Sequence, residues 1–303
     1  MDPVLGLYLV GAFAFLMIIG VPIAISIGVS SALILLSAMP FHVALSTAGQ
    51  KMVNGIDSFS LLAVPLFIMA GNIMNHGGIA RRLVDFAYLF VGKIPGSISH
   101  VNVVANMLFG SVSGSAVAAV AAVGKTLLPE AKKAGMDIPL FTAANIASGP
   151  TGQIIPPSNG MIVYSVVSGG TSIGALFLAG YLPGIIMGLC SMIVVAIYLK
   201  IHPQWAGKNP EIKLSFSKVI NVIWRAFPSM AMIVVVIGGI IGGIYTATEA
   251  ACSAVVYALI LSGLYKQLNI RVLTEMAKDT ILISSMVLFL IGCSTVMSYV
   301  LAY

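Results

Sequence analysis

The sequence carries little charge for its length. Of its 303 residues, 15 are Lys or Arg and 9 are Asp or Glu, so only 8% are charged and the net charge is +6. A soluble domain carries roughly 25% charged residues. Because 59% of the residues are hydrophobic, the composition excludes an ordinary soluble enzyme and indicates a polytopic membrane protein.

Residue patterns that indicate catalysis, metal binding or disulfides are also scarce. The three cysteines, Cys190, Cys252 and Cys293, lie in apolar segments without disulfide or metal-site spacing and are interpreted as small core residues. The sequence has no phosphate-binding loop, no cluster of metal ligands and no catalytic Ser/His/Asp or paired-carboxylate arrangement. Nothing in it indicates a cofactor, and membrane topology explains its basic residues without nucleic-acid binding.

The uncharged stretches predict a series of membrane spans, because a span needs about 20 mostly apolar helical residues. Residues 4–39 carry no charge and are too long for one crossing, and Gly20-Val21-Pro22 offers a break between two helices. The segments between spans, including 40–55 and 266–279, are predicted to be loops. The predicted spans are 4–20, 22–39, 56–75, 139–167, 174–199, 226–243, 248–265 and 280–303.

The uncharged region 94–124 decides the topology. Its 31 residues are too few for two crossings, and its middle, Gly110 to Ser115, is small and polar, so it forms either one crossing or a re-entrant hairpin. A hairpin places 14 of the 15 Lys and Arg residues on one face, in 76–96, 125–138, 200–225 and 266–279. The positive-inside rule therefore favours the hairpin, with the N-terminus and loop 40–55 outside and the basic loops in the cytoplasm.

A weak internal similarity predicts an inverted repeat. The segment VPLFIMAG (64–71) resembles MVLFLIGC (286–293) at an offset of 222 residues. The first unit has an odd number of crossings, so the second unit must start from the opposite side of the membrane. The same offset predicts a second hairpin beyond Tyr303, so we interpret the chain as part of a protein of roughly 425 residues with a truncated second repeat.

This organisation predicts four parts. They are scaffold helices in 1–75, a transport part in 76–173, a span with a cytoplasmic arm in 174–225, and the first three spans of the second repeat in 226–303. Within the arm, 208–225 alternates basic and large apolar residues, which is typical of an interfacial amphipathic helix.

Two segments are predicted to interrupt helices at membrane depth, where unpaired backbone groups are tolerated only beside a protein cavity. The first is the hairpin tip, 110–118, which is rich in glycine and serine. The second is 148–160, where Pro156-Pro157 and three glycines predict an unwound helix. The alternatives are a helix-packing seam for the first and a simple kink for the second.

These interruptions offer oxygen ligands and helix dipoles. Unpaired carbonyls and hydroxyls are hard ligands suited to Na⁺. The positive ends of the half-helices favour an anionic substrate group, and no Lys or Arg lies at membrane depth to take that role. The hydroxyls expected to contribute belong to Ser113, Ser115, Thr151 and Ser158.

Other polar residues in apolar surroundings have two interpretations each. Glu249 either functions at membrane depth or caps the helix that begins near 248, with Thr246 or Thr248 as its partner. His100 is either a hydrogen-bonded core histidine or a proton or substrate group. Side chains that either orient the breaks or make interhelical hydrogen bonds are Asn102, Asn106 and Asn145.

Three motifs together resemble a known family. They are GSVSGSAVAAVAAVG (110–124), GPTGQIIPPSNGMIVY (149–164) and GGIYTATEAA (242–251), in that order. The chain is similar along its whole length to the large membrane (M) subunit of tripartite ATP-independent periplasmic (TRAP) transporters. The family's second hairpin and second broken helix have no counterpart in this sequence.

The resemblance implies an all-α, inverted-repeat, elevator-type importer of the bacterial inner membrane, driven by Na⁺ and without a cofactor. It implies a periplasmic binding (P) protein that delivers an organic acid, such as sialic acid or a C4-dicarboxylate, and a small four-helix Q subunit. It also implies that one Na⁺ site and part of the substrate site are framed by Ser111, Ser113, Gly114, Ser115, Gly149, Pro150, Thr151, Gly152, Pro156, Pro157, Ser158 and Asn159. A further contribution is carried over to Thr246, Thr248 and Glu249.

Two other functions stay open at this point. A divalent-anion sodium symporter shares hairpins and broken helices, and it would take up its solute without a binding protein. An intramembrane enzyme would show hydrolytic activity that depends on His100 or Glu249.

Overall fold

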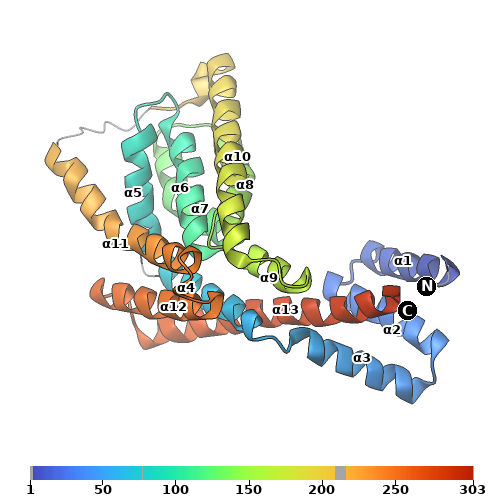
Figure 1. Ribbon diagram of the computed structural model, residues 1–303. Helices are drawn as coiled ribbons and strands as arrows, with labels where there is room; N and C mark the ends of the chain where they lie inside the picture. Colours follow the sequence, from blue (N-terminus) through green and yellow to red (C-terminus); the bar gives the residue numbers. More distant parts are fainter. Residues whose placement is uncertain (1–2, 77, 209–215, 303) are drawn as a thin grey trace. The chain divides into compact units, whose positions relative to one another are not determined.

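The computed structural model describes residues 3–76, 78–208 and 216–302, which are helical almost throughout (Figure 1). No strand occurs in these ranges, so the all-α prediction is confirmed. The helices are α1 (Pro3–Ile18), α2 (Ile23–Ala38), α3 (Phe41–Ile56), η1 (Phe59–Leu62), α4 (Ala63–His76), α5 (Ile79–Val91), α6 (Ser97–Ser113), α7 (Ala116–Lys133), α8 (Ile138–Ile154), α9 (Asn159–Val167), α10 (Ile173–Ile201), η2 (Pro203–Trp205), α11 (Phe216–Ile241), α12 (Ala247–Leu264) and α13 (Ile270–Ala302).

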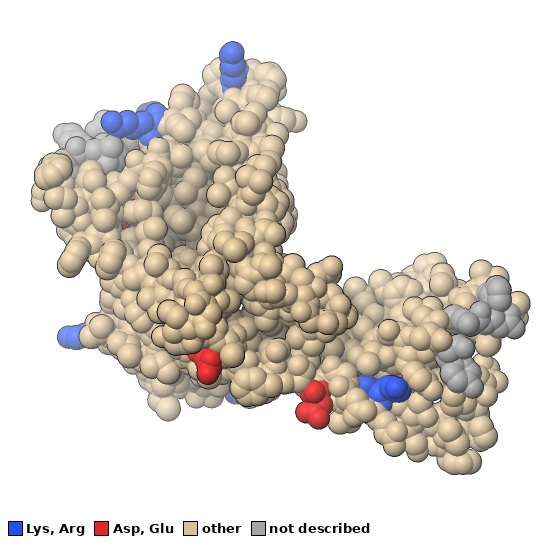
Figure 2. All heavy atoms as spheres, in the orientation of Figure 1, with Lys and Arg blue, Asp and Glu red and all other residues tan. Residues whose placement is uncertain are grey.

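Several helices have the length and composition of membrane spans. Among the described residues, these are α10, α12, α13 and residues 219–241 of α11, and α3 with 59–75 adds a fifth if that pair, bent by 65°, is one span. Helices α1 and α2 are apolar but have 16 residues each, which is about 24 Å of helix. Most atoms on the face in Figure 2 belong to uncharged residues. The protein is a multi-pass membrane protein.

Two predicted loops are wrong. Residues 40–55 form most of the amphipathic helix α3, and 270–279 form the first turns of the 33-residue α13. A charge-based division of the sequence recognises only helices that are apolar on all sides. A helix with polar residues, such as Gln50 and Lys51 in α3, is therefore mistaken for a loop.

The predicted amphipathic arm also requires correction. Residues 209–215 lie outside the described residues, but 216–225 continue directly into the following span as the single helix α11. Pro228 lies inside this helix without ending it. The arm was predicted because basic and large apolar residues alternate in 208–225, although the change in polarity after Arg225 does not require a break in the backbone.

The chain forms two compact units, Met1–Leu61 with Ile281–Tyr303, and Leu62–Thr280. In the first, α1, α2 and α3 share a small core with the C-terminal part of α13, made of Leu9, Ile34, Leu35, Ala44, Val296 and Val300. Close contacts with small residues join these helices, because Gly28 lies against Cys293 and Gly55 against Thr295. The predicted division into four parts stays a prediction.

The second unit holds the predicted hairpin and broken helix. Helices α6 and α7 are joined by only two residues, and both pack against α8 (Figure 1). Helices α5 and α10 cover this group, and α4 packs against α12. The side chain of Asn72 donates a hydrogen bond of 3.0 Å to Thr280, which lies about three turns into α13. The second unit therefore has the hairpin at its centre.

Candidate functional site

The hairpin tip turns on one glycine. Helix α6 ends at Ser113, and Gly114 takes the left-handed conformation, with φ +63°, while its N–H donates to the carbonyl of Gly110. This is the usual way in which glycine ends a helix. The next residue, Ser115, caps α7 because its Oγ accepts a hydrogen bond of 3.3 Å from Ala118. A helical hairpin with its tip at 114–115 is present, and its second helix runs to Lys133, beyond the predicted end at 124. Its re-entrant insertion into the membrane stays a prediction.

The broken helix is also present, but the break is shorter than predicted. Only 155–158 are non-helical, whereas 148–154, including Pro150, remain in α8. One proline removes one hydrogen bond, and the hydroxyl of Thr151 bonds to the Ser148 carbonyl at 2.5 Å within the same turn. The tandem prolines that follow end the helix, because two successive residues lack a donor.

Four predicted site residues are therefore placed in regular helix: Gly149, Pro150, Thr151 and Gly152. Their backbone is not unwound, which corrects the predicted extent of the break. The carbonyl of Thr151 accepts from the N–H of Ile155 at 2.9 Å. The carbonyls without an intrahelical partner are those of the last turn of α8.

Helix α9 begins in the same way as α7. The Oγ of Ser158 accepts a hydrogen bond of 3.4 Å from Met161, and Ser158 is buried. Neither α7 nor α9 has an acidic residue in its first turn. Both half-helices therefore keep the positive end of their dipole uncompensated by a neighbouring carboxylate.

The structure brings the hairpin tip and the break together. A Cβ placed on Gly114 would lie 3.3 Å from the carbonyl oxygen of Pro157 and 3.2 Å from the Nδ2 of Asn159. Four residues before Gly114, a Cβ placed on Gly110 of α6 would overlap the Cα of Gly152 in α8. The two predicted motifs thus form one locus, and the absence of side chains on Gly110 and Gly152 permits the contact.

Several oxygens converge at this locus without strong partners. The Ser113 hydroxyl is buried and makes only long hydrogen bonds, donating to the Ser115 carbonyl at 3.4 Å and accepting from the Ser115 N–H at 3.4 Å. The Oδ1 of Asn159 is buried and has no hydrogen-bond partner among the described residues. Ser111 is more fully engaged, since its hydroxyl donates to the Leu108 carbonyl at 2.8 Å. Hydroxyl, amide and carbonyl oxygens of this kind suit a hard cation.

A buried amide network supports the locus. The Nδ2 of Asn106 lies 2.9 Å from the Oδ1 of Asn145 and 2.8 Å from the Oγ of Ser148. The Nδ2 of Asn145 donates to the Val120 carbonyl at 3.0 Å, which links α8 to α7. Of the two interpretations, the structure shows interhelical hydrogen bonds for Asn106 and Asn145, and these bonds hold three helices in register.

His100 and Asn102 are buried in α6, with 2% and 0% exposure. Their side-chain polar atoms have no hydrogen-bond partner among the described residues. The hydrogen-bonded core interpretation of His100 is therefore not borne out. A buried polar group normally has a partner, so these two side chains are exceptions within the described residues.

Glu249 forms a helix cap. Its carboxylate accepts from the N–H of Thr246 at 2.7 Å and from the Thr246 hydroxyl at 2.8 Å, while Thr246 accepts from the N–H of Glu249. This reciprocal capping box starts α12. The geometry matches the capping interpretation, and neither capping group belongs to the contact between tip and break. Thr248 is buried beside them.

One contact of the locus was missed from the sequence. Gly71 in the middle of α4 lies against the hairpin tip, because a Cβ there would be 2.7 Å from the carbonyl oxygen of Ser113. The only available signal was a glycine inside an otherwise apolar helix, which usually has a packing or functional reason.

This architecture defines a polytopic α-helical membrane protein in which a helical hairpin meets a helix break. No group of three His, Cys, Asp or Glu residues within the described ranges could hold a metal ion. Residues 10–303 match the family model described as "Tripartite ATP-independent periplasmic transporter, DctM component". The chain belongs to this family, which is one of transporter permeases rather than enzymes.

Three relatives illustrate the similarity. The chain is 48% identical over 291 residues to the "Uncharacterized protein YgiK" of Salmonella typhimurium, covering 96% of this chain and 66% of the relative. It is 37% identical to the sialic acid TRAP transporter large permease protein SiaM of Vibrio cholerae, with 84% and 59% coverage. It is 35% identical to the isethionate TRAP transporter permease protein DctMQ of Oleidesulfovibrio alaskensis, with 95% and 45% coverage. The chain thus spans two thirds or less of these relatives.

Proposed function

We propose that this chain takes part in Na⁺-coupled import of an organic acid across the bacterial inner membrane. The observation that carries the proposal is the contact of the hairpin tip with the break, at Gly114, Pro157 and Asn159. It places weakly engaged oxygens next to two helix N-termini. Such an arrangement suits a cation and an anionic group bound side by side, which is the chemistry of Na⁺ symport.

The proposal extends to the solute and the mechanism. The sialic acid and isethionate in the names of two relatives are both organic acids, and the positive ends of α7 and α9 suit a carboxylate or sulfonate. We assign Ser111, Ser113 to Ser115, Gly149 to Gly152 and Pro156 to Asn159 to the Na⁺ and substrate region. In this proposal, α6 to α9 move as one elevator-type body in an inverted-repeat protein whose N-terminus is periplasmic.

The proposed partners are a periplasmic binding protein and a Q membrane component. The Q component is either a separate four-helix subunit or a fused part of the chain, as the name DctMQ of the isethionate relative suggests. A symporter that works without a binding protein is the competing proposal. Dependence of uptake on the binding protein distinguishes the two.

Uptake by vesicles containing the complete transporter tests the proposal. The variant Ser113→Ala removes a weakly bonded buried hydroxyl and should lower Na⁺-dependent uptake at least tenfold, since losing a ligand of a bound ion costs more than about 1.4 kcal/mol. The matched control is Ser37→Ala, which removes an exposed serine hydroxyl in α2. Pro157→Ala, which restores a backbone donor in the break, should also impair uptake. Unchanged uptake and Na⁺ dependence in both site variants would refute the assignment.

A further inference from the structure

A polar cavity lies between α5 and the C-terminal half of α7, away from the hairpin tip. Its volume is about 770 Å³, and its wall includes small and apolar residues from both helices. The polar residues that line it are Asn75, Arg81, Lys125, Thr126, Glu130 and Lys133. We call it the α5–α7 cavity. All of it lies within the second compact unit.

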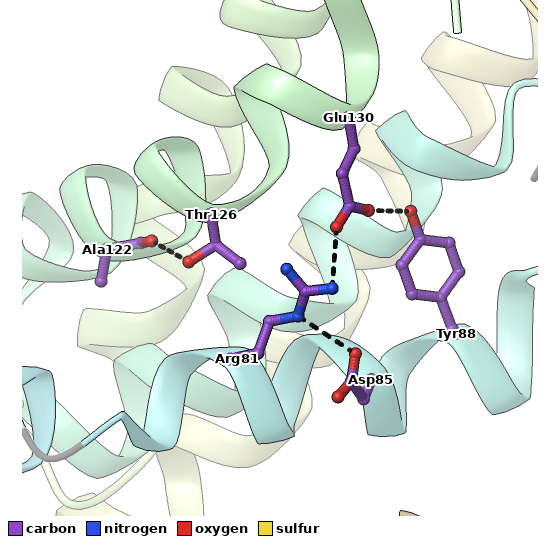
Figure 3. A network of polar contacts seen from close by, with 6 residues as sticks. All are labelled: Arg81, Asp85, Tyr88, Ala122, Thr126 and Glu130. Atoms are coloured by element: carbon purple, nitrogen blue, oxygen red, sulfur yellow. Dashed lines mark hydrogen bonds and ion pairs between the residues drawn. The ribbon is translucent and has the colours of Figure 1, made fainter. Parts of the chain in front are cut away.

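The wall of the cavity holds Arg81 in place. The Nη2 of Arg81 pairs with Glu130 at 3.1 Å, and its Nε pairs with Asp85 at 3.5 Å. Figure 3 shows Arg81 of α5 between these two carboxylates. The second oxygen of Glu130 accepts from the Tyr88 hydroxyl at 3.0 Å. Burial raises the pKa of the Tyr88 phenol, so this group stays protonated and keeps its hydrogen bond.

The two lysines of the cavity have no such partners. Neither Lys125 nor Lys133 forms an ion pair with another residue of the described chain, and both are exposed. They stand eight residues apart, on the same face of α7. Arg81 is already balanced by Glu130 and Asp85. The three cations outnumber the two carboxylates by one, and the two lysines without an ion pair suit an anion with more than one charged oxygen.

The depth of the lysines indicates where that anion comes from. Lys125 is ten residues beyond Ser115 at the tip of the hairpin, which is about 15 Å along a helix. Half of the hydrocarbon core of a bilayer is also about 15 Å. With the tip at the midplane, as the proposed function requires, Lys125 lies where the acyl chains end and the phosphates begin, and Lys133 lies among the headgroups.

We propose that the α5–α7 cavity binds the phosphate headgroup of an anionic phospholipid. Lys125 and Lys133 contact the phosphate oxygens, Asn75 offers an amide donor, and the small apolar part of the wall accommodates the glycerol. Basic pockets beside membrane helices on the cytoplasmic side are suited to such headgroups. The cavity is separate from the Na⁺ and substrate region, so the lipid acts as a ligand of the transport unit rather than as its cargo.

Lipid titration of the purified complete protein tests this inference. Cardiolipin, phosphatidylglycerol or phosphatidylcholine is added to delipidated protein in detergent, and binding is measured by native mass spectrometry and by the apparent Tm. We expect both anionic lipids, but not phosphatidylcholine, to bind and to raise the Tm. The double variant Lys125→Gln with Lys133→Gln should bind the anionic lipids roughly 30-fold more weakly, since each lysine near headgroups contributes about a five- to sixfold change in affinity.

The matched control is Lys93→Gln with Lys132→Gln. It removes the same charge from exposed positions outside the cavity, and one of them, Lys132, is adjacent to Lys133 in sequence. This control should keep its lipid affinity within about twofold. Equal losses of lipid affinity in the two double variants would mean that the anionic lipids are attracted by the overall positive charge rather than by the cavity, and would overturn the proposal.

Two further measurements separate the lipid from other anions. Glycerol phosphate and succinate are added without lipid, and protection by either at the concentration where cardiolipin protects would overturn the lipid assignment. If the double variant unfolds, Lys133→Gln alone, at the exposed end of α7, should still lose lipid affinity several-fold. The readout does not depend on transport, so failure of the proposed function leaves the lipid binding result interpretable.

Discussion

Four helices of the second unit begin with a hydroxyl cap, but their surroundings differ, and the cap of α10, Ser172, is exposed. Ser115, Ser158 and Thr246 each accept a hydrogen bond from the N–H three residues ahead. Only α12, which starts at Thr246, has an acidic residue in its first turn, Glu249. Because a carboxylate offsets the positive end of a helix dipole, α12 is already compensated. The starts of α7 and α9 are not.

Burial separates these starts in the same sense. Ser158 is buried and Ser115 is half-buried, whereas the hydrogen bonds of the Thr246 cap are exposed. An electrostatic interaction is stronger where water is excluded. The comparison teaches that a helix start becomes a candidate binding site when it is buried and lacks its own carboxylate. The same cap with an internal partner is a structural element.

The largest expected effect is on stability, and it compares a glycine in the close contact of α6 with α8 with a glycine that has open space around it. Gly152→Ala places a Cβ against the backbone of Gly110. Backbone atoms in two packed helices cannot shift to relieve this overlap without a cost in stability. We expect a loss of about 3 kcal/mol in stability, seen as a lower apparent Tm. Gly238→Ala in α11 is the control, because a Cβ there has nothing within 4 Å. A Tm for Gly152→Ala equal to that of the control would contradict the close approach of α6 and α8.

The next effect concerns the amide network under the tip. Asn145→Ala removes the hydrogen bond to the Val120 carbonyl and leaves the Nδ2 of Asn106 with one acceptor fewer. The expected cost is about 1–2 kcal/mol in thermal unfolding, together with weaker Na⁺ dependence of uptake. Asn221→Ala, at an exposed position of α11, serves as the control and should change neither quantity. Equal thermal unfolding and equal Na⁺ dependence in the two variants would show that the amide network does not support the site.

The two kinds of cap should differ in function although they resemble each other in stability. Ser115→Ala and Thr246→Ala each remove one capping hydroxyl, at about 1 kcal/mol. We expect only Ser115→Ala to alter Na⁺-dependent uptake, because Thr246 lies outside the contact between tip and break. Uptake measured per folded protein makes this distinction. A loss of Na⁺ dependence in Thr246→Ala alone would reverse the comparison.

The smallest expected effect tests the compensated cap directly. Glu249→Gln keeps a hydrogen-bonding side chain at an exposed site and removes its charge. The apparent Tm should fall slightly, and the difference should shrink at high salt because exposed charges are screened. A severe loss of uptake without loss of Tm would instead give Glu249 a role in transport.

Much of the candidate site was predictable because it contains glycine and proline, the residues with the most unusual backbone dihedral preferences. Glycine at 114 and tandem prolines at 156 and 157 restrict the backbone locally, so the hairpin turn and the helix break follow from the sequence. The extent of the break did not follow. Pro150 stays helical, which depends on the packing of α8 against α6 and α7 rather than on local propensity.

Contacts between distant segments were not predictable from one sequence. Gly71 and Ser113 are far apart along the chain, and no sequence pattern around either residue predicts their contact. The bonds of Asn145 to α6 and α7 were one of two open interpretations for the same reason. Amphipathic α3 and the start of α13 were missed as helices because only long apolar runs were counted as spans.

Composition and local backbone chemistry by themselves determined that this chain is helical, lies in a membrane and contains a hairpin and a broken helix. Such properties depend on each residue's own solvation and dihedral freedom, which do not require a partner. Tertiary structure alone decided that the tip lies on the break and that Asn145 joins three helices. Those outcomes depend on which surfaces meet in space, because a hydrogen bond or a close approach needs two partners.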